Sequence, residues 1–202
     1  MAKTKNNTKF VALKTYLGMD NYALVFTANQ STRKQQSKRN MKSIKIATFL
    51  VALFAAFGAS AQLPAIDVKT LDGKTISAAE LTNDGKPMIV SFWATWCKPC
   101  QRELKAIHDN YADWQDETGV KVIAVSVDEA QDVNKVKPLV DAEGWEYEVL
   151  LDSNSELMHA LGIQMVPHML ILDGQGNIVE SHSGYIDGSE DQIIDKLREI
   201  AK

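Results

Sequence analysis

Two cysteines separated by two residues constrain this 202-residue chain more than any other feature, because the chain has no others. Cys97 and Cys100 follow an apolar run at 88–93 that is typical of a buried strand. They precede apolar residues at helical spacing, which predict a helix that ends near Thr118, just before Gly119. The sequence therefore places the pair where a strand leads into a helix.

This position favours thiol chemistry. The unpaired N–H groups and the dipole at a helix N-terminus stabilise a thiolate, and Lys98 adds a positive charge next to Cys97. Pro99 suits the first helical turn, where its missing N–H costs no hydrogen bond. We therefore predict that Cys97 attacks disulfides and that Cys100, one turn further along, resolves the mixed disulfide.

Two other interpretations of the pair are half of a zinc site and two inert core thiols. A zinc site needs further ligands, but the chain has no second cysteine pair, and its four histidines do not form an H-x₃₋₅-H unit. The preceding strand, Trp96 and Pro99 favour a redox-active pair over inert thiols. No metal is expected.

The first 61 residues differ in composition from the rest of the chain. Within 41–61, a short basic start is followed by an almost continuous apolar run and a final Ala-Ser-Ala, as in a secretory signal peptide. The apolar run is shorter than the ~18–20 residues that span a bilayer, so we expect cleavage near Ala61 rather than retention as an anchor. Residues 1–40 are basic and polar and stay unassigned; translation from Met41 would place them upstream of the true start.

Charge changes sign at the same boundary. Residues 1–61 hold 10 lysines and arginines against one aspartate, whereas residues 62–202 hold 12 against 25 acidic residues, a net charge of −13. So acidic a segment is a poor candidate for binding nucleic acid or anionic lipid. Residues 62–202 are long enough for one domain with its own core, and membrane contact is expected only if the signal segment is retained.

Apolar strands alternate with amphipathic helices throughout residues 62–202, which predicts an α/β fold with a mixed sheet. An Asp72-Gly73 turn indicates a hairpin at 65–76. Side-chain caps are predicted at Ser77, at 153–154 and at Ser189. Beyond the cysteine motif we expect a strand at 120–127, a helix within 128–142 that Pro138 starts or kinks, a strand at 147–151, a helix ending at Gly162, strands at 168–172 and 177–182, and a helix from Ser189.

The motif Phe92-Trp93-Ala94-Thr95-Trp96-Cys97-x-Pro99-Cys100 resembles the active site of thioredoxin-fold thiol–disulfide oxidoreductases, and especially that of exported bacterial TlpA/ResA-like proteins. The resemblance implies a thioredoxin-like domain with a mixed central sheet flanked by helices. It also implies that the 65–76 hairpin and a helix–strand insertion at 131–151 are additions to the plain thioredoxin unit. The resemblance covers nearly all of 64–202, although its motif is confined to 92–103.

The resemblance implies substrate-binding residues beyond the cysteines. Pro167 matches the cis-proline that faces the active site in such folds, which would leave the backbone of Val166 free to pair with a substrate strand. An ordinary trans proline at the start of a strand is the alternative. Trp96 is expected to offer partners an apolar contact, whereas Trp93 fits the core better.

Glu103 stands one turn after Cys100, where TlpA/ResA-like proteins often carry a glutamate linked to thiol protonation. A partly buried carboxylate there would exchange protons with Cys100. The alternative is a surface acid paired with Arg102 or Lys105.

Two residues depart from the family pattern. Ser91 replaces the buried aspartate of ordinary thioredoxins, which shifts proton exchange to Glu103 or to water. His168 stands where a small residue is more usual. It would either contact the substrate or the cysteines, or serve as a hydrogen-bonded structural histidine.

The resemblance implies an exported enzyme, soluble in the bacterial periplasm, that exchanges disulfides with protein substrates. The expected role is reduction of envelope protein disulfides, as in cytochrome c maturation, with electrons from a membrane thiol donor and no organic cofactor. An oxidase or isomerase, which would use the same cysteine pair to transfer electrons in the opposite direction, is an alternative. The direction depends on the reduction potential of the pair, and reduction potentials within the family spread over ~150 mV, or about 7 kcal/mol for two electrons. A non-catalytic copper-delivery module is another alternative, since thiolates bind Cu(I). A peroxiredoxin-like peroxidase would need a lone peroxidatic cysteine in a Thr/Arg setting, which the chain does not supply.

Overall fold

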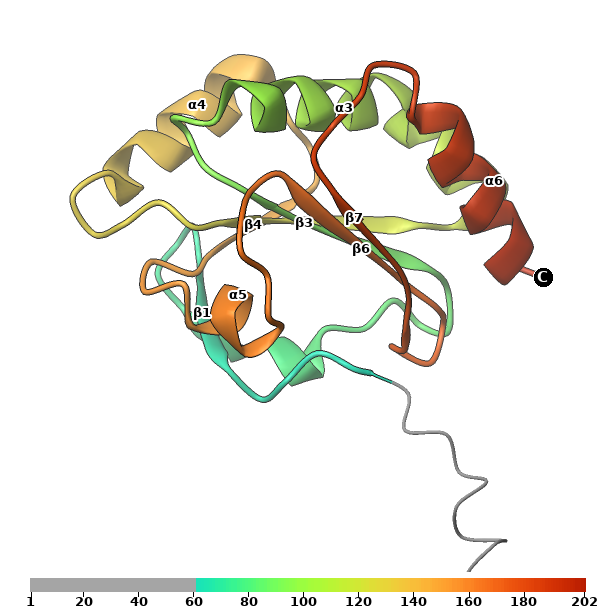
Figure 1. The fold of residues 1–202 in the computed structure, drawn as a ribbon, viewed down its shortest axis with the longest axis horizontal. Helices are drawn as coiled ribbons and strands as arrows, with labels where there is room; N and C mark the ends of the chain where they lie inside the picture. The colour runs from blue at the N-terminus through green and yellow to red at the C-terminus, as the bar shows by residue number, and fades with distance from the viewer. Residues whose placement is uncertain (1–60) are drawn as a thin grey trace, which may run out of the picture. The chain divides into compact units, whose positions relative to one another are not determined.

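A seven-stranded mixed sheet runs through the part of the chain that the computed structural model describes, residues 61–202 (Figure 1). The strand order is β2-β1-β5-β4-β3-β6-β7. At its centre, β3 (Met88–Trp93) runs parallel to β4 (Lys121–Ser126) and antiparallel to β6 (His168–Leu172). All six residues of β3 are buried, as expected of a central strand covered on both faces.

The predicted hairpin and insertion extend one side of this sheet. β1 (Asp67–Thr70) and β2 (Thr75–Ser77) form an antiparallel hairpin whose turn places Gly73 at φ +83°. The insertion supplies α4 (Val136–Glu143) and β5 (Glu148–Leu151), and β5 pairs with β4 on one side and with β1 on the other. The thioredoxin-like fold with both additions is confirmed.

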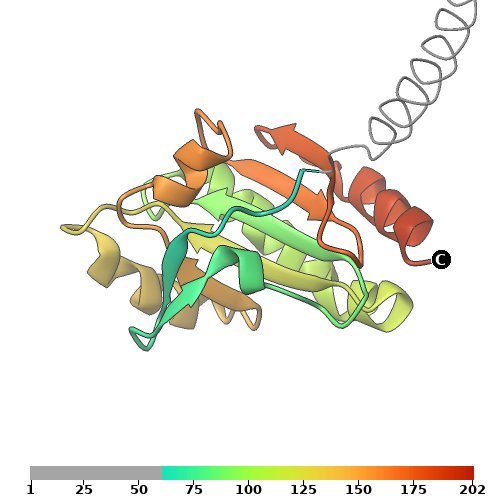
Figure 2. The same cartoon turned by 90° about the horizontal axis from the view of Figure 1, so that it is seen from below.

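Helices cover both faces of the sheet. α3 (Lys98–Thr118), α4 and α6 (Glu190–Ile200) lie over one face, whereas α5 (Glu156–Ala160) and a 3₁₀ turn at Ala78–Glu80 lie over the other (Figures 1 and 2). The buried side chains of α6 are Ile193, Ile194 and Leu197, and Leu197 is completely covered. The sheet ends at β7 (Ile178–Ser183), one residue further along than predicted.

Two helices end at glycines, of which Gly119 was predicted. Gly119 ends α3 at φ +69° and Gly144 ends α4 at φ +68°, a left-handed conformation that residues with a Cβ adopt only at a cost. α4 begins later than the predicted segment, after a 3₁₀ turn at Val133–Lys135. Pro138 therefore lies in the first turn, where no intrahelical bond needs its N–H.

The predicted side-chain caps are wrong. Neither Ser77 nor Ser189 accepts a capping hydrogen bond with its side chain. In front of α5 the capping carboxylate belongs to Asp152, not to residues 153–154, and it accepts from two backbone N–H groups of the helix at 3.0 and 3.3 Å. Asp152 follows β5 directly and is buried, so the sheet places its carboxylate before the helix.

The predicted signal peptide at 41–61 and the unassigned segment 1–40 lie outside the described residues, except for Ala61. From residue 61 onward, no helix combines the length and apolar character needed to cross a membrane. Among the described residues, Leu63 is the first member of the core. Next to it, Gln62 forms an isolated antiparallel bridge with Asn177 before β7.

Candidate active site

Cys97 and Cys100 form a disulfide at the start of α3, with their Cα atoms 5.3 Å apart. Cys97 is the residue that caps the helix, and its Sγ accepts from the backbone N–H of Cys100 at 3.3 Å. Cys97 is 5% exposed and Cys100 is fully buried. Cys97 is therefore the more accessible of the two residues.

The turn before the disulfide separates two tryptophans with different surroundings. The N–H of Cys97 donates to the carbonyl of Ala94 at 3.0 Å, which closes the turn between β3 and α3. Trp96, inside the turn, is 64% exposed, whereas Trp93 is buried and packs edge-on against Trp145 with ring centroids 5.2 Å apart. Trp93 is thus a core residue, and Trp96 is an apolar surface beside the reactive sulfur.

Glu103 lies on the covered side of α3. It is 3% exposed, and the hydroxyl of Ser91 on β3 donates to its Oε2 at 2.8 Å. Burial raises the pKa of Glu103 to about 7, although the hydrogen bond from Ser91 opposes this shift. The alternative surface pairing is wrong, because Arg102 pairs with Asp187 at 3.7 Å and Lys105 pairs with an aspartate one turn along α3.

A cavity of about 400 Å³ adjoins Glu103 between α3, β7 and α6. Its lining includes Met169 of β6, His182 of β7 and Gln192 of α6, together with the segment after β7 that contains Asp187. A cavity of this size holds several water molecules. The buried carboxylate therefore adjoins a space through which it can exchange protons.

The bond between Val166 and Pro167 is cis, as the resemblance implies. Phe92 of β3 pairs with His168 of β6, so this bond lies at the end of the sheet where β3 leads toward Cys97. The Pro167 carbonyl accepts from a backbone N–H after β7 at 2.8 Å. Among the described residues, the backbone of Val166 has no hydrogen-bond partner, so it presents a free donor and acceptor.

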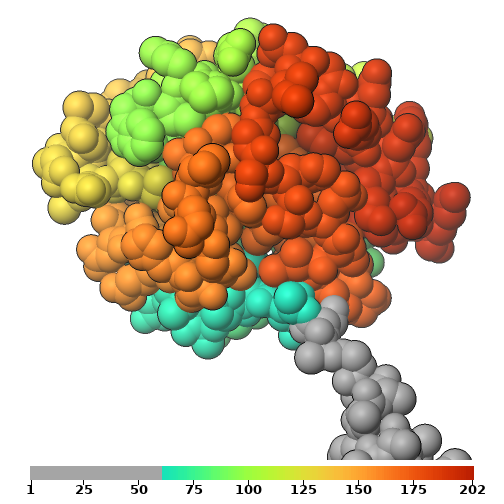
Figure 3. All heavy atoms as spheres, in the orientation of Figure 1, coloured from blue at the N-terminus to red at the C-terminus, as the bar shows by residue number. Residues whose placement is uncertain are grey.

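Three segments that are distant in sequence lie side by side near the start of α3. In the space-filling view, the green start of α3 borders the orange chain before β6 and the red chain after β7 (Figure 3). Each segment carries one of the large exposed apolar side chains: Trp96, Met165 and Ile186.

His168 matches the structural alternative. Its Nδ1 lies 2.8 Å from Ser183 Oγ and its Nε2 lies 2.9 Å from Ser181 Oγ, so both ring nitrogens are hydrogen-bonded within the sheet. Partial burial lowers the pKa of His168, and nearby His182 adds to the effect. A neutral imidazole between two hydroxyls fits this environment.

One buried residue of the site was not predicted from the sequence. Asp128 follows β4, is fully buried and accepts hydrogen bonds from Thr95 in the turn before Cys97. An aspartate directly after an interior strand was the available signal, but the motif at 92–103 gives no hint of a contact 33 residues away. No group of three or more metal-binding side chains occurs within residues 61–202.

Comparisons with known proteins agree with this geometry. The model of the AhpC/TSA family matches residues 59–181. Thiol-disulfide oxidoreductase ResA of Halalkalibacterium halodurans is 30% identical over 67% of this chain and 72% of its own length. Sporulation thiol-disulfide oxidoreductase A of Bacillus subtilis is 31% identical over 70% and 88%. Among solved structures, an uncharacterized thioredoxin-like protein from Porphyromonas gingivalis is 57% identical, covers 70% of this chain and 93% of its own, and has a TM-score of 0.64.

Proposed function

This chain belongs to the AhpC/TSA family, and on that premise we propose that it is an exported reductase of protein disulfides in the bacterial envelope. It is a thiol–disulfide oxidoreductase, as are its named relatives. The observation that carries the proposal is the disulfide at the helix start, with Cys97 slightly exposed and Cys100 fully buried. Cys97 is the attacking thiolate and Cys100 the resolving thiol.

In the proposed cycle the reduced protein attacks a target disulfide. Cys97 Sγ bonds to one target sulfur, the target S–S bond breaks, and the other target sulfur leaves as a thiolate that takes a proton from water. Cys100 then loses its proton to Glu103 and attacks Cys97 Sγ. The second target thiolate leaves, and the Cys97–Cys100 disulfide of the structure forms. Two electrons have passed to the target, so a dithiol donor must reduce the enzyme again.

Glu103 suits the second step because its pKa of about 7 leaves much of it ionised near neutral pH. A carboxylate with an ordinary pKa would be a weaker base toward a thiol. The adjoining cavity supports a route by which Glu103 returns the proton to solvent. Ser91, which donates to the same carboxylate, holds it in place.

Substrate binding is proposed for Trp96, Val166 and Pro167. The exposed ring of Trp96 would cover apolar side chains near the target disulfide. Among the described residues, the backbone of Val166 is unpaired at this end of the sheet, which supports strand-like pairing with an extended target.

Export remains part of the proposal. Within residues 61–202 the first buried core residue is Leu63, so cleavage after Ala61 would keep every core residue that the structure describes and would release residues 62–202 into the periplasm. The electron donor would then be a membrane thiol protein on the same side. Sequencing the N-terminus of the protein recovered from the envelope tests this, with Gln62 as the expected first residue.

Mixed-disulfide trapping tests the division of labour. With Cys100→Ala the second step is blocked, so we expect disulfide-linked target proteins that dithiothreitol releases. Cys97→Ala is the matched control and should trap none. If Cys97→Ala traps the same targets instead, the two roles are reversed.

The redox state in cells tests the direction. A reductase is kept as the dithiol by its donor, whereas an oxidase is kept as the disulfide. Recovery of mostly reduced protein after acid quenching and alkylation is expected, and mostly oxidised protein would favour the oxidase.

A further inference from the structure

Thr95 lies in the turn between β3 and α3, and all its polar groups are bonded to other residues. Its N–H donates to Asp128 Oδ2 at 2.8 Å and its hydroxyl donates to Asp128 Oδ1 at 2.6 Å. Its carbonyl accepts from Gln101 Nε2, in the first turn of α3, at 2.6 Å. We call this arrangement of Thr95, Asp128 and Gln101 the Thr95 clamp.

The sheet anchors the Asp128 side of the clamp. Ser126, the last residue of β4, donates its hydroxyl to Asp128 Oδ2 at 2.8 Å and accepts from the Asp128 N–H at 3.1 Å. Ser126 pairs with Trp93, and the N–H of Val127 donates to the Trp93 carbonyl at 2.8 Å. Asp128 is fully buried. A buried carboxylate is costly unless it is well hydrogen-bonded, and this one accepts three hydrogen bonds.

The clamp matters most when the disulfide is open. In the oxidised protein the S–S bond holds Cys97 Sγ close to the start of α3. In the reduced protein that bond is absent, and the sulfur keeps its place near the Cys100 N–H only if the backbone of the turn stays where it is. Thr95 is two residues before Cys97 in that turn.

We propose that Asp128 is a positioning residue for the reaction: through Thr95 it holds the turn so that reduced Cys97 remains the N-terminal cap of α3. This inference rests on the proposed role of Cys97 as the attacking thiolate. Because a thiolate at a helix N-terminus is stabilised by the unpaired N–H groups, a sulfur that drifts from them is a weaker acid. Loss of the clamp therefore makes Cys97 less reactive.

Considered by its charge alone, Asp128 has the opposite effect on the acidity of Cys97. A carboxylate near a thiolate disfavours the thiolate, so its neutralisation alone would make Cys97 more acidic. Thr95→Val separates the two effects, since it removes one bond of the clamp and leaves every charge unchanged. Lys98, Arg102 and Glu103 of α3 and Asp128 itself all keep their charges in this variant.

The test measures iodoacetamide alkylation of Cys97 against pH in the full chain carrying Cys100→Ala, in which Cys97 is the single thiol. Thr95→Val and Asp128→Asn should each slow alkylation at pH 7 about threefold or more and move its midpoint toward the ~8.5 of a free cysteine. Thr95→Ser, which keeps the hydroxyl, should restore most of the rate. The double variant should be no slower than the slower single variant, because both break one clamp.

Thr118→Val is the matched control. It removes another buried hydroxyl of α3, which donates to the Trp114 carbonyl at 2.7 Å at the far end of the helix, and it should leave alkylation unchanged. An unchanged or faster rate in Thr95→Val would overturn the clamp, because that variant breaks a hydrogen bond of the clamp and changes no charge. If Asp128→Asn does not fold, Thr95→Val decides alone. If Cys97 alkylates like a free thiol before any clamp residue is changed, the proposed function fails instead.

Discussion

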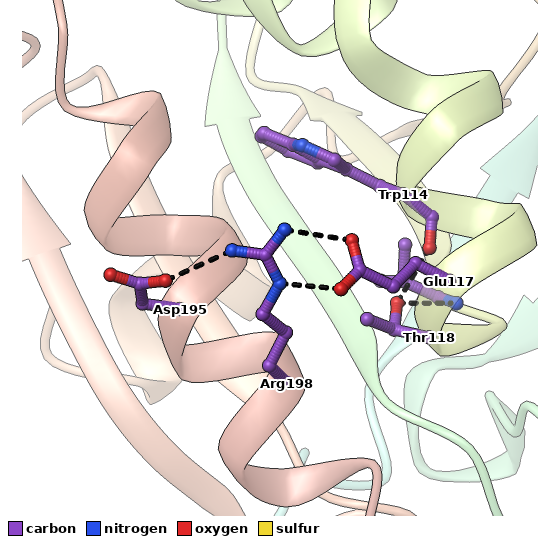
Figure 4. A network of polar contacts seen from close by, with 6 residues as sticks. Trp114, Glu117, Thr118, Asp195 and Arg198 are labelled. Carbon is purple, nitrogen blue, oxygen red and sulfur yellow. Dashed lines mark hydrogen bonds and ion pairs between the residues drawn. The ribbon is translucent and has the colours of Figure 1, made fainter.

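The two ends of α3 carry polar side chains in very different surroundings. At the N-terminal end, Glu103 is buried and bonded to one neutral hydroxyl. At the C-terminal end, the guanidinium of Arg198 on α6 donates to both oxygens of Glu117 and to Asp195, on a surface open to water (Figure 4). Comparison of these two glutamates of one helix shows how burial changes the pKa of a carboxylate and therefore its role.

The pKa values of the two glutamates are shifted in opposite directions. Burial raises the pKa of Glu103 to about 7, whereas the hydrogen bonds from Arg198 lower the pKa of Glu117. Water surrounds Glu117 and screens its ion pair, so that pairing changes the energy of the protein little. Among the described residues, no cation pairs with the buried carboxylate of Glu103, so no ion pair offsets the free-energy cost of burying its charge. We therefore expect Glu103, near the N-terminal end of α3, to take part in proton transfer, and Glu117, at the C-terminal end, only to help α6 dock.

The largest expected difference between the ends is in how stability depends on pH. The raised pKa of Glu103 means that its stabilising, protonated form is fully present below about pH 4.5 and is lost as the pH rises through about 7. Oxidised wild-type protein should therefore lose about 3 kcal/mol of unfolding free energy over this window relative to Glu103→Gln. Urea unfolding of both proteins from pH 4 to 8 measures it.

Glu117→Gln is the control for that series. Because the pKa of Glu117 is lowered, its contribution is present above the unfolded pKa and is lost as the pH falls. Its curve should follow that of the wild type closely between pH 5 and 8. Parallel curves for Glu103→Gln and wild type would show that Glu103 is hydrated and that the contrast between the ends is wrong.

The second prediction concerns the rate of resolution. Glu103→Gln keeps the shape of the side chain and an acceptor for Ser91, but it cannot take the proton of Cys100. We expect the release of a target from its mixed disulfide to slow about 100-fold near pH 7, the lower end of what a general base contributes. Rapid-quench measurement with a disulfide-bonded model protein tests this. Glu117→Gln should match the wild type, and an equal rate in Glu103→Gln would leave water as the base.

The residues that were predictable from the sequence act within short segments. The cysteine pair follows from its spacing and from its place between a strand and a helix, whereas Glu103 and the cis bond at Pro167 follow from the family resemblance. Asp128 was missed because its partner Thr95 is 33 residues away and only the pairing of β3 with β4 brings them together. The caps at Ser77 and Ser189 were wrong because a serine before a helix shows only that a cap is available, and here neither side chain uses it.

The burial of Glu103 also depends on residues distant in sequence. The hydroxyl of Tyr147, just before β5, donates to the carbonyl of Leu104 at 3.2 Å and thereby ties the insertion to α3 beside Glu103. Sequence spacing placed Glu103 one turn after Cys100 but left open whether it faces water. The alternative pairing with Arg102 or Lys105 was equally consistent with that spacing. The structure settles it, because Glu103 is 3% exposed and accepts from Ser91 of the central strand β3.

The third prediction tests the backbone at the C-terminal end of α3. Gly119 has φ +69°, and a Cβ there would clash with the flexible side chain of Lys86. Gly119→Ala should therefore cost about 1 kcal/mol of unfolding free energy, mainly from the left-handed backbone. Gly119→Asn, which tolerates this conformation better, should cost less. Denaturant unfolding ranks the two, and equal losses would assign the cost to the Lys86 contact.

The smallest effect is expected from the ion pairs at that same end. Arg198→Met keeps much of the apolar stem and removes the hydrogen bonds to Glu117 and Asp195. Both sides of the Glu117–Arg198 pair are half-exposed, and exposed pairs contribute little because water and salt screen them. The loss of stability should be smaller than that of Gly119→Ala and should shrink further at 1 M salt, with no change in the resolution rate. A loss that exceeds that of Gly119→Ala and persists in salt would mean that α6 depends on this contact for docking, and the second end of α3 would then be as sensitive as the first.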